Sequence, residues 1–240
     1  MKKRTAFLLS LLFFAGIGSH GQTALFSFGY SVEQYCETAP FELVVNDFNQ
    51  YFSEPAYIPD NALEAPDFTK GILFGFKINS GWSTFGIDYH VHRYVDRAGG
   101  IDSIGNEYYR KININHNGLG FSYNLNLIHA EGFRAGPGFS FNMDQFYAKF
   151  KTGNGTYDEY FVPVDKILLS ATARFMLSFG KEDGFNFDIV PYYMLPFRKV
   201  NIVDFKHDLN PENSSVFTNE DMTFDPTNMG IMVTLNFNVN

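Results

Sequence analysis

Residues 228–239, with the sequence NMGIMVTLNFNV, form the most regular stretch of the chain. The odd-numbered positions of this stretch hold the apolar side chains Met229, Ile231, Val233, Leu235, Phe237 and Val239. The positions between them hold mainly Asn, Gly and Thr. Successive side chains of a β-strand point to opposite sides, so this alternation predicts a strand with one apolar and one polar face.

Seven other segments carry the same alternation, so the chain is predicted to be all-β. Three of them are as regular as the last, with apolar positions at Phe133, Ala135, Phe139, Phe141 and Met143, at Ile167, Leu169, Ala171, Ala173, Phe175, Leu177 and Phe179, and at Phe185, Phe187, Ile189, Tyr193, Leu195 and Phe197. Four earlier strands are predicted at 23–34, 70–79, 82–96 and 107–126. The total of eight is the even number that an antiparallel up-and-down barrel requires.

The strand predicted at 107–126 changes phase along its length. Ile112 and Ile114 are even-numbered, whereas the later apolar residues, Leu119 and Phe121 among them, are odd-numbered. Asn117-Gly118 lies at the change, and a glycine within a strand often marks an inserted residue. We therefore predict a β-bulge at Asn117-Gly118.

Alternation alone does not say whether the apolar face meets lipid or the core of a soluble, lipocalin-like barrel. The links between strands favour lipid, because long and short links alternate. The predicted long links are 35–69, 97–106, 151–163 and 200–227, and the short ones are 79–81, 127–132 and 180–184. Short periplasmic turns at one end and long extracellular loops at the other are typical of a transmembrane β-barrel.

The composition agrees with a barrel in a membrane. Of the 240 residues, 18% are aromatic, including 28 Phe and 14 Tyr, and only 18% are charged. Soluble domains carry roughly a quarter charged residues. The single cysteine, Cys36, excludes an intramolecular disulfide, so strand pairing and packing must supply the stability.

The first 21 residues are typical of a signal peptide. Lys2, Lys3 and Arg4 form a basic start, and 6–18 is a short apolar run. The segment Ser19-His20-Gly21 then places small residues where a signal peptidase cleaves, before Gln22. We therefore expect a signal peptide at 1–21 and one barrel domain at 22–240, exported to the outer membrane of a Gram-negative cell.

These features together resemble the small outer-membrane β-barrel families, both the OmpX/OmpA-like barrels and the outer-membrane β-barrel domain proteins of Bacteroidota. The resemblance rests on the signal peptide, the eight alternating segments and the last strand, Gly230 to Phe237. It implies an eight-stranded antiparallel transmembrane barrel with short periplasmic turns and long extracellular loops. The chain departs from many such barrels because it ends in Val239-Asn240 rather than in an aromatic residue.

Charged residues occur on the polar faces of the predicted strands. They are Glu33, Lys77, Asp88, Arg134, Asp144, Lys166, Arg174 and Asp188. Such residues can line a narrow pore, or they can pair with one another and fill the lumen. The interior of an eight-stranded barrel is just wide enough for side chains to fill it, which favours the paired network.

Three histidines share this polar environment. His90 and His92 follow Asp88 on one strand, and His116 lies in the partner strand. Some eight-stranded barrels are lipid-modifying enzymes that use His and Ser, and two histidines at this spacing can also bind a metal. No serine has the sequence context of a nucleophile, so a lumen cluster of hydrogen-bonded histidines is the favoured interpretation.

The predicted extracellular loops are acidic. Residues 35–69 contain seven Asp or Glu and no Lys or Arg, and in the last loop Glu220, Asp221 and Asp225 are weak candidates for a cation site. Without the three basic residues of the signal, 15 Lys and Arg face 26 Asp and Glu, a net charge of −11. Such a chain is a poor nucleic-acid binder.

Helical spacing interrupts the alternation in the first predicted loop. Phe41, Val44, Val45, Phe48 and Phe52 are spaced as one face of a helix. Thr38 is placed to cap that helix, with Pro40 and Glu42 in its first turn. Such a helix can cover the barrel mouth as a lid or lie at the membrane interface.

Three functions remain open from the sequence. The first is a structural or interaction barrel, expected to be monomeric and without a cofactor, that meets outer-membrane lipids, lipopolysaccharide or an extracellular or envelope protein. The second is a narrow channel for small solutes, and the third is a lipid-modifying barrel enzyme. Conductance supports the second, and lipid turnover lost on His90→Ala supports the third. We favour the first.

Overall fold

The computed structural model describes residues 23–52, 57–102, 105–153, 158–181, 184–209, 218 and 220–239. The predicted signal peptide and its cleavage site before Gln22 lie outside these residues. No helix within the described residues is long and apolar enough to cross a membrane.

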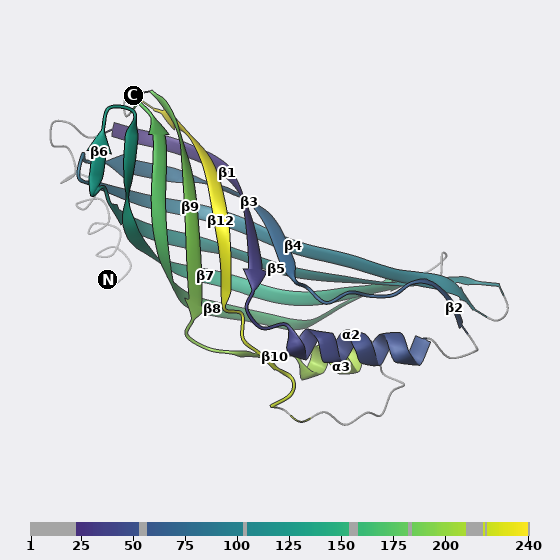
Figure 1. Cartoon of the computed structure of the whole chain (residues 1–240). Coiled ribbons are helices and arrows are strands. Elements are labelled where there is room, and N and C mark those ends of the chain that lie inside the picture. Colours follow the sequence, from purple (N-terminus) through teal and green to yellow (C-terminus); the bar gives the residue numbers. More distant parts are fainter. Residues whose placement is uncertain are drawn as a thin grey trace, which may run out of the picture.

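Eight long strands in the described part of the chain form one closed antiparallel sheet. They are β1 (Thr23–Tyr35), β3 (Phe68–Asn79), β4 (Ser83–Asp102), β5 (Glu107–Leu125), β7 (Phe133–Gly153), β8 (Asp158–Gly180), β9 (Phe185–Pro196) and β12 (Asn228–Asn238). Each pairs with the next of these strands, and β12 pairs with β1 from Asn238↔Leu25 to Asn228↔Tyr35, which closes the barrel (Figure 1). Within the barrel, closure leaves no free sheet edge, as hydrocarbon requires.

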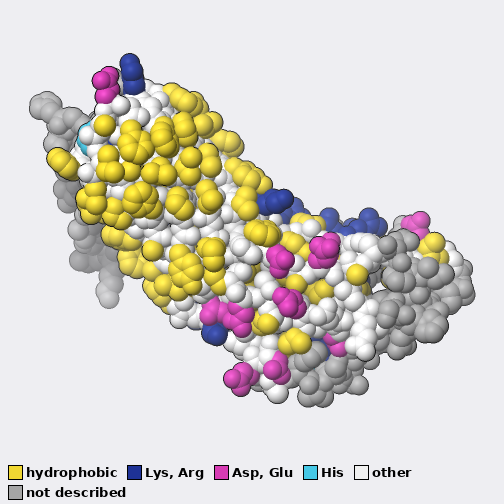
Figure 2. Space-filling view, viewed as in Figure 1, with side chains coloured by type: hydrophobic (Ala, Val, Ile, Leu, Met, Phe, Trp, Pro, Cys, Tyr) yellow, Lys and Arg dark blue, Asp and Glu magenta, His cyan; other side chains and the backbone are white. Residues whose placement is uncertain are grey.

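The apolar positions point out of this barrel and the polar positions point into it. On β7, Phe139 and Met143 are more than half exposed, whereas Ser140 and Asp144 on the other face are buried. The outward apolar side chains form a broad continuous band over the barrel (Figure 2). An apolar surface of this extent is stable only against hydrocarbon, so the barrel spans a membrane. The lipocalin-like arrangement, with the faces reversed, is excluded.

Four of the strands continue well beyond the barrel. The strands β4, β5, β7 and β8 have 19 to 23 residues, whereas β1, β3, β9 and β12 have 11 to 13. The excess projects from one end as a curved sheet, here called the extension (Figure 1). At about 3.3 Å per residue it is roughly 25–30 Å long.

The extension corrects two of the predicted loops. Residues 97–102 belong to β4, and β5 begins at Glu107. Likewise β7 runs to Gly153 and β8 begins at Asp158, so the predicted loops 97–106 and 151–163 are mostly strand. The predicted short turns at the other end are present, with β6 (Ile128–Ala130) as a small pairing beside the start of β7.

The predicted β-bulge at Asn117-Gly118 is wrong. The register of β5 against both β4 and β7 runs through Asn117 and Gly118 without a shift. Ile112 and Ile114 point to the inside like His116, because β5 has left the membrane there and its inner face packs against helices. Gly118 is instead a point of close approach, since a Cβ at this position would lie 1.7 Å from Asp144 Oδ1.

Two helices pack on the inner face of the extension, α2 (Ala39–Phe52) and the short α3 (Val203–Leu209) (Figure 1). We call them the cap, together with the small pair β10 (Val200–Asn201) and β11 (Thr223–Phe224). The short β2 (Tyr57–Asn61) pairs with the end of β4. The cap and the extension share one apolar core: Tyr35, Phe41, Val44, Val45, Phe48, Leu63, Ala98, Ile112, Ile114, Phe146, Ala148, Phe150, Val164, Leu168, Val200, Ile202, Phe205, Leu209, Met222 and Phe224.

The helix predicted at 41–52 is present as α2. Thr38 hydrogen-bonds through its hydroxyl to the Glu42 carboxylate, and the Glu42 N–H donates to the Thr38 carbonyl at 3.0 Å. Phe41 and Phe48 are completely or almost completely buried in the shared core. The apolar face of α2 therefore packs on protein rather than on the membrane interface, and of the two predicted placements the structure has the one at the barrel mouth.

Candidate functional site

The barrel lumen is filled by polar side chains in layers. Near the turn end, Lys77 Nζ donates to Asp188 Oδ2 at 2.5 Å, to Thr234 Oγ1 at 2.9 Å and to Asn236 Oδ1 at 3.0 Å. The same Asn236 oxygen accepts the Ser27 hydroxyl at 2.6 Å. Lys77 is thus a buried cation whose three donors are all used, as a charge removed from water requires.

Most of the predicted lumen charges lie in this interior. Arg134 donates to Ser178 at 3.0 Å at the turn end, and Asp88 lies 3.4 Å from His90. Arg174 is buried and lines the same small cavities as Asp88. Lys166 is the exception: it is exposed and pairs with Phe146 where the extension begins, so its ammonium reaches water.

A cluster of three histidines and two carboxylates lies between the polar lumen and the apolar core. His90 Nε2 lies 3.0 Å from Asp144 Oδ1, and His116 Nε2 lies 3.1 Å from Asp144 Oδ2. On its other side, His116 Nδ1 lies 3.4 Å from Glu33 Oε1, and His92 Nδ1 lies 3.7 Å from the same oxygen. The predicted clustering of His90, His92 and His116 is therefore present, and the structure adds Glu33 and Asp144 to it.

Two small cavities lie among the lumen side chains. They measure about 10 and 30 Å³. The larger lies beside Glu33, His92, His116 and Arg174. Such volumes accommodate about one water molecule each. The aromatic side chains of the shared core then cover the lumen beyond the histidines, with Phe224 packed on Tyr35, Phe41 and Phe146 at ring-centroid distances of 5.1, 4.8 and 5.6 Å.

The acidic residues of the last loop do not converge. Asp221 accepts the Thr218 hydroxyl at 2.6 Å, and Asp225 accepts the Thr227 hydroxyl at 2.6 Å. Hydrogen bonds from Thr218 lower the pKa of Asp221. Partial burial raises the pKa of Asp225, but hydrogen bonds from Thr227 and the charge of Lys199 outweigh it and lower that pKa. Each carboxylate thus binds a threonine within its own turn. Among the described residues, Glu220, Asp221 and Asp225 form no common set of metal ligands.

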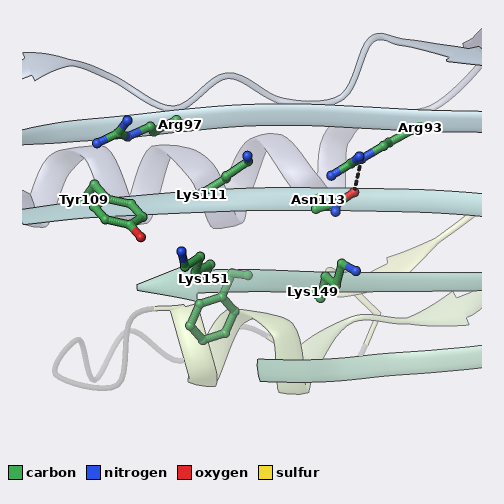
Figure 3. A pocket seen from close by; sticks show the side chains of 8 residues that line it. Arg93, Arg97, Tyr109, Lys111, Asn113, Lys149 and Lys151 are labelled. Atoms are coloured by element: carbon green, nitrogen blue, oxygen red, sulfur yellow. Dashed lines mark hydrogen bonds between the residues drawn. The ribbon is translucent and has the colours of Figure 1, made fainter. Parts of the chain in front are cut away.

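A basic pocket of about 380 Å³ lies on the outer face of the extension, opposite the cap (Figure 3). It is lined by Arg93, Arg97, Tyr109, Lys111, Asn113, Lys149, Phe150 and Lys151, without an acidic residue. The side chains come from β4, β5 and β7, which places five cations over three neighbouring strands. Figure 2 shows Lys and Arg side chains gathered along this edge of the extension, beyond the apolar band.

The strand register sets like charges directly opposite one another in this pocket. Arg97 pairs with Lys111, and Lys111 pairs with Lys151. Like charges opposite each other on neighbouring strands destabilise a sheet. The Tyr109 ring offsets part of this cost, since Arg97 lies 4.4 Å and Lys151 lies 5.5 Å from its centre. A row of three cations is an arrangement that an anion would stabilise.

The basic pocket was not predicted from the sequence. The alternation did carry a signal, because Arg93 and Arg97, Lys111, and Lys149 and Lys151 all occupy odd-numbered, outward positions of their strands. Segments 97–106 and 151–163 were predicted as loops, however, and a loop has no fixed faces. Only with these segments as strands do the five cations share one surface.

Neither a protein-family model nor a curated protein sequence matches the chain. Among solved structures it is similar to Ail, the attachment invasion locus protein of Yersinia pestis, at 10% identity and a TM-score of 0.40, over 92% of this chain and 99% of that one. It is also similar to the outer membrane protease OmpT of Escherichia coli, at 9% identity and a TM-score of 0.36, over 90% of this chain and 96% of that one.

Proposed function

We propose that the protein is an integral outer-membrane barrel of the interaction type, which holds a rigid sheet and cap outside the cell. The observation that carries this proposal is the row of Arg97, Lys111 and Lys151 on the outer face of the extension. Like charges directly opposite one another on neighbouring strands destabilise a sheet, and a bound anion would reduce their repulsion.

The proposed ligand is a phosphorylated sugar of lipopolysaccharide. The last strongly exposed apolar residue of β7 before the pocket is Met143, and Lys149 follows six positions later on the same face. Six residues of strand span roughly 20 Å along the strand, and the height along the membrane normal is smaller when the strand is tilted. The pocket therefore lies just beyond the hydrocarbon, at the height of lipid headgroups and their sugars. Arg and Lys are the side chains that bind phosphate best.

The narrow channel finds less support. The two cavities described above are about the size of single water molecules, and the aromatic core covers the mouth. We expect the folded protein, reconstituted in a planar bilayer, to produce no unitary conductance steps above those of a protein-free bilayer. Regular steps that change in size when Arg174 is replaced by Ala would support the channel instead.

The lipid-modifying enzyme has one suggestive contact and one obstacle. Ser31 Oγ lies 2.5 Å from His92 Nε2, which is the pairing of a nucleophile with its base. Ser31 is only 1% exposed, however, and it points into the lumen. An acyl chain would not fit the cavity of about 30 Å³ beside His92. Lipid turnover that is lost on Ser31→Ala would support the enzyme.

Replacing Arg97, Lys111 and Lys151 together by Ala is expected to weaken binding of lipopolysaccharide by about 100-fold or more. Each charge-assisted contact to phosphate contributes on the order of 1 kcal/mol, and three are removed. Binding is measured by titrating lipopolysaccharide onto the protein in nanodiscs. Addition of salt is expected to lower the affinity of the wild-type protein for lipopolysaccharide more than that of the triple variant.

A matched control removes two exposed lysines outside the pocket, Lys166 and Lys199. The control variant Lys166→Ala/Lys199→Ala is expected to bind like the wild-type protein. Dephosphorylated lipopolysaccharide and free inorganic phosphate form two further arms, which separate recognition of the glycolipid from binding of any phosphate. Equal weakening in the pocket variant and the control, or unchanged binding of dephosphorylated material, would overturn the proposal.

A further inference from the structure

We propose that Glu33, His92 and His116 form a site for a divalent transition-metal ion of the zinc type inside the barrel. The three residues come from β1, β4 and β5, and each is at most 4% exposed. Their ligand atoms, one carboxylate oxygen and two imidazole nitrogens, all lie within 4.8 Å of one another. Zinc binds this combination of ligands in tetrahedral sites.

The distances between the ligand atoms of this set match those around a tetrahedral ion. Two ligand atoms about 2.0–2.1 Å from a tetrahedral zinc ion stand about 3.4 Å apart. Glu33 Oε1 lies 3.4 Å from His116 Nδ1 and 3.7 Å from His92 Nδ1. The second set in the cluster, His90, His116 and Asp144, has shorter separations of 3.0 and 3.1 Å. The spacing of the first set is the closer of the two to that of ligands on one ion.

One ligand atom is also without a partner. His92 Nδ1 is buried and makes no hydrogen bond within the described part of the chain. A buried polar nitrogen left unpaired is costly and uncommon, and it calls for an explanation. Because His92 Nδ1 faces Glu33 at 3.7 Å, an ion at this point would satisfy it.

The surroundings of the three ligands are those of a metal site. The far nitrogen of His92 lies 2.5 Å from Ser31 Oγ, and that of His116 lies 3.1 Å from the carboxylate of Asp144, an ion-pair contact without the geometry of a hydrogen bond. Histidine ligands in proteins are oriented in this way by a hydrogen-bonding group or a carboxylate on the other ring nitrogen. Glu33 is itself fixed, since it accepts the Thr69 hydroxyl at 2.7 Å and the Tyr192 hydroxyl at 3.0 Å.

Charge and space also suit an ion. The cavity of about 30 Å³ lined by Glu33, His92 and His116 is large enough for one water molecule as a fourth ligand. A divalent ion with neutral histidines would balance the negative charges of Glu33 and Asp144. The cap covers the site, so the ion would enter as the barrel folds and would then stabilise the folded chain. This role is independent of the proposed binding of lipopolysaccharide.

The test measures metal content in the folded, full-length mature protein. The protein is refolded in detergent with Zn²⁺, washed with a weak chelator and assayed for zinc per chain, with the gel shift on boiling as the check of folding. We expect about one zinc per folded chain. We expect His92→Ala and Glu33→Gln to lose at least about 100-fold in affinity, and Ser31→Ala about 10–100-fold, as for groups that support a ligand.

Two controls and a second measurement make the outcome unambiguous. The exposed His129→Ala should keep the zinc. His90→Ala, which leaves the first set intact, should keep it too. With Co²⁺ in place of Zn²⁺, the wild-type protein should show the visible absorption of a tetrahedral site, so the proposal does not depend on variants that fail to fold. A wild-type barrel that folds without retaining metal, or a folded His92→Ala that retains it, would overturn the proposal.

Discussion

Lys77→Met is expected to destabilise the barrel by about 3–5 kcal/mol. The substitution keeps the length and packing of the side chain but removes the cation that Asp188 and Thr234 contact at 2.5 and 2.9 Å. The Asp188 carboxylate, with a side chain only 3% exposed, then loses its ion-pair partner Lys77. The free energy of unfolding is measured by urea titration in lipid vesicles, followed by the fluorescence of the single tryptophan, Trp82.

The matched control is a lysine in a solvent-exposed ion pair. Lys199 lies 3.6 Å from Asp225, and its side chain is 56% exposed. Lys199→Met should therefore cost no more than about 1 kcal/mol. The double variant Lys77→Met/Asp188→Leu should recover most of the lost stability, because it leaves no unpaired charge. A Lys77→Met barrel as stable as the control would show that this pair does not hold the lumen together.

Phe224→Ala is expected to lower the free energy that holds the cap on the extension by about 3–5 kcal/mol, while the barrel stays folded. The Phe224 ring is fully buried and packs on Tyr35, Phe41 and Phe146, so it joins the first strand, α2 and the extension. The substitution leaves a cavity at the point where these elements meet. Hydrogen exchange should show faster exchange of the α2 amides, whereas the gel shift of the closed barrel on boiling should persist.

Leu43→Ala provides the comparison for this variant. Leu43 lies on the exposed side of α2 and is 39% exposed, so its removal creates no cavity. Leu43→Ala should change the stability of the cap by no more than about 0.5 kcal/mol, as for most surface substitutions. If Phe224→Ala left the α2 amides as protected as Leu43→Ala does, the shared core would not be what holds the cap. If it abolished the gel shift as well, the cap and the barrel would form a single cooperative unit.

The sequence by itself determined the eight strands and the direction of their faces. In 228–239, and equally in the segment from Phe133 to Met143, side chains alternate by position, and this alternation depends only on neighbours in the chain. Because a one-residue shift would reverse every side chain, such a pattern fixes which residues meet lipid. The helix at 41–52 was predictable for the same reason, since its buried face repeats with helical spacing. The helix α3, with seven residues, is too short to show such a repeat.

The tertiary structure alone decided where the membrane part of each strand ends and which side chains meet. In the sequence, Ile112 and Ile114 are out of phase with the apolar residues that follow them, and only the structure shows that the cap packs on them at the inner face of β5. Lys166 occupies an inward position in the sequence pattern, and only the structure shows that it lies at the rim of the barrel. The same holds for Glu33, His92 and His116, and for the cations of the basic pocket. Residues on different strands come together only through the register of a closed sheet. That register depends on all the strand pairings at once and leaves no local mark in the sequence.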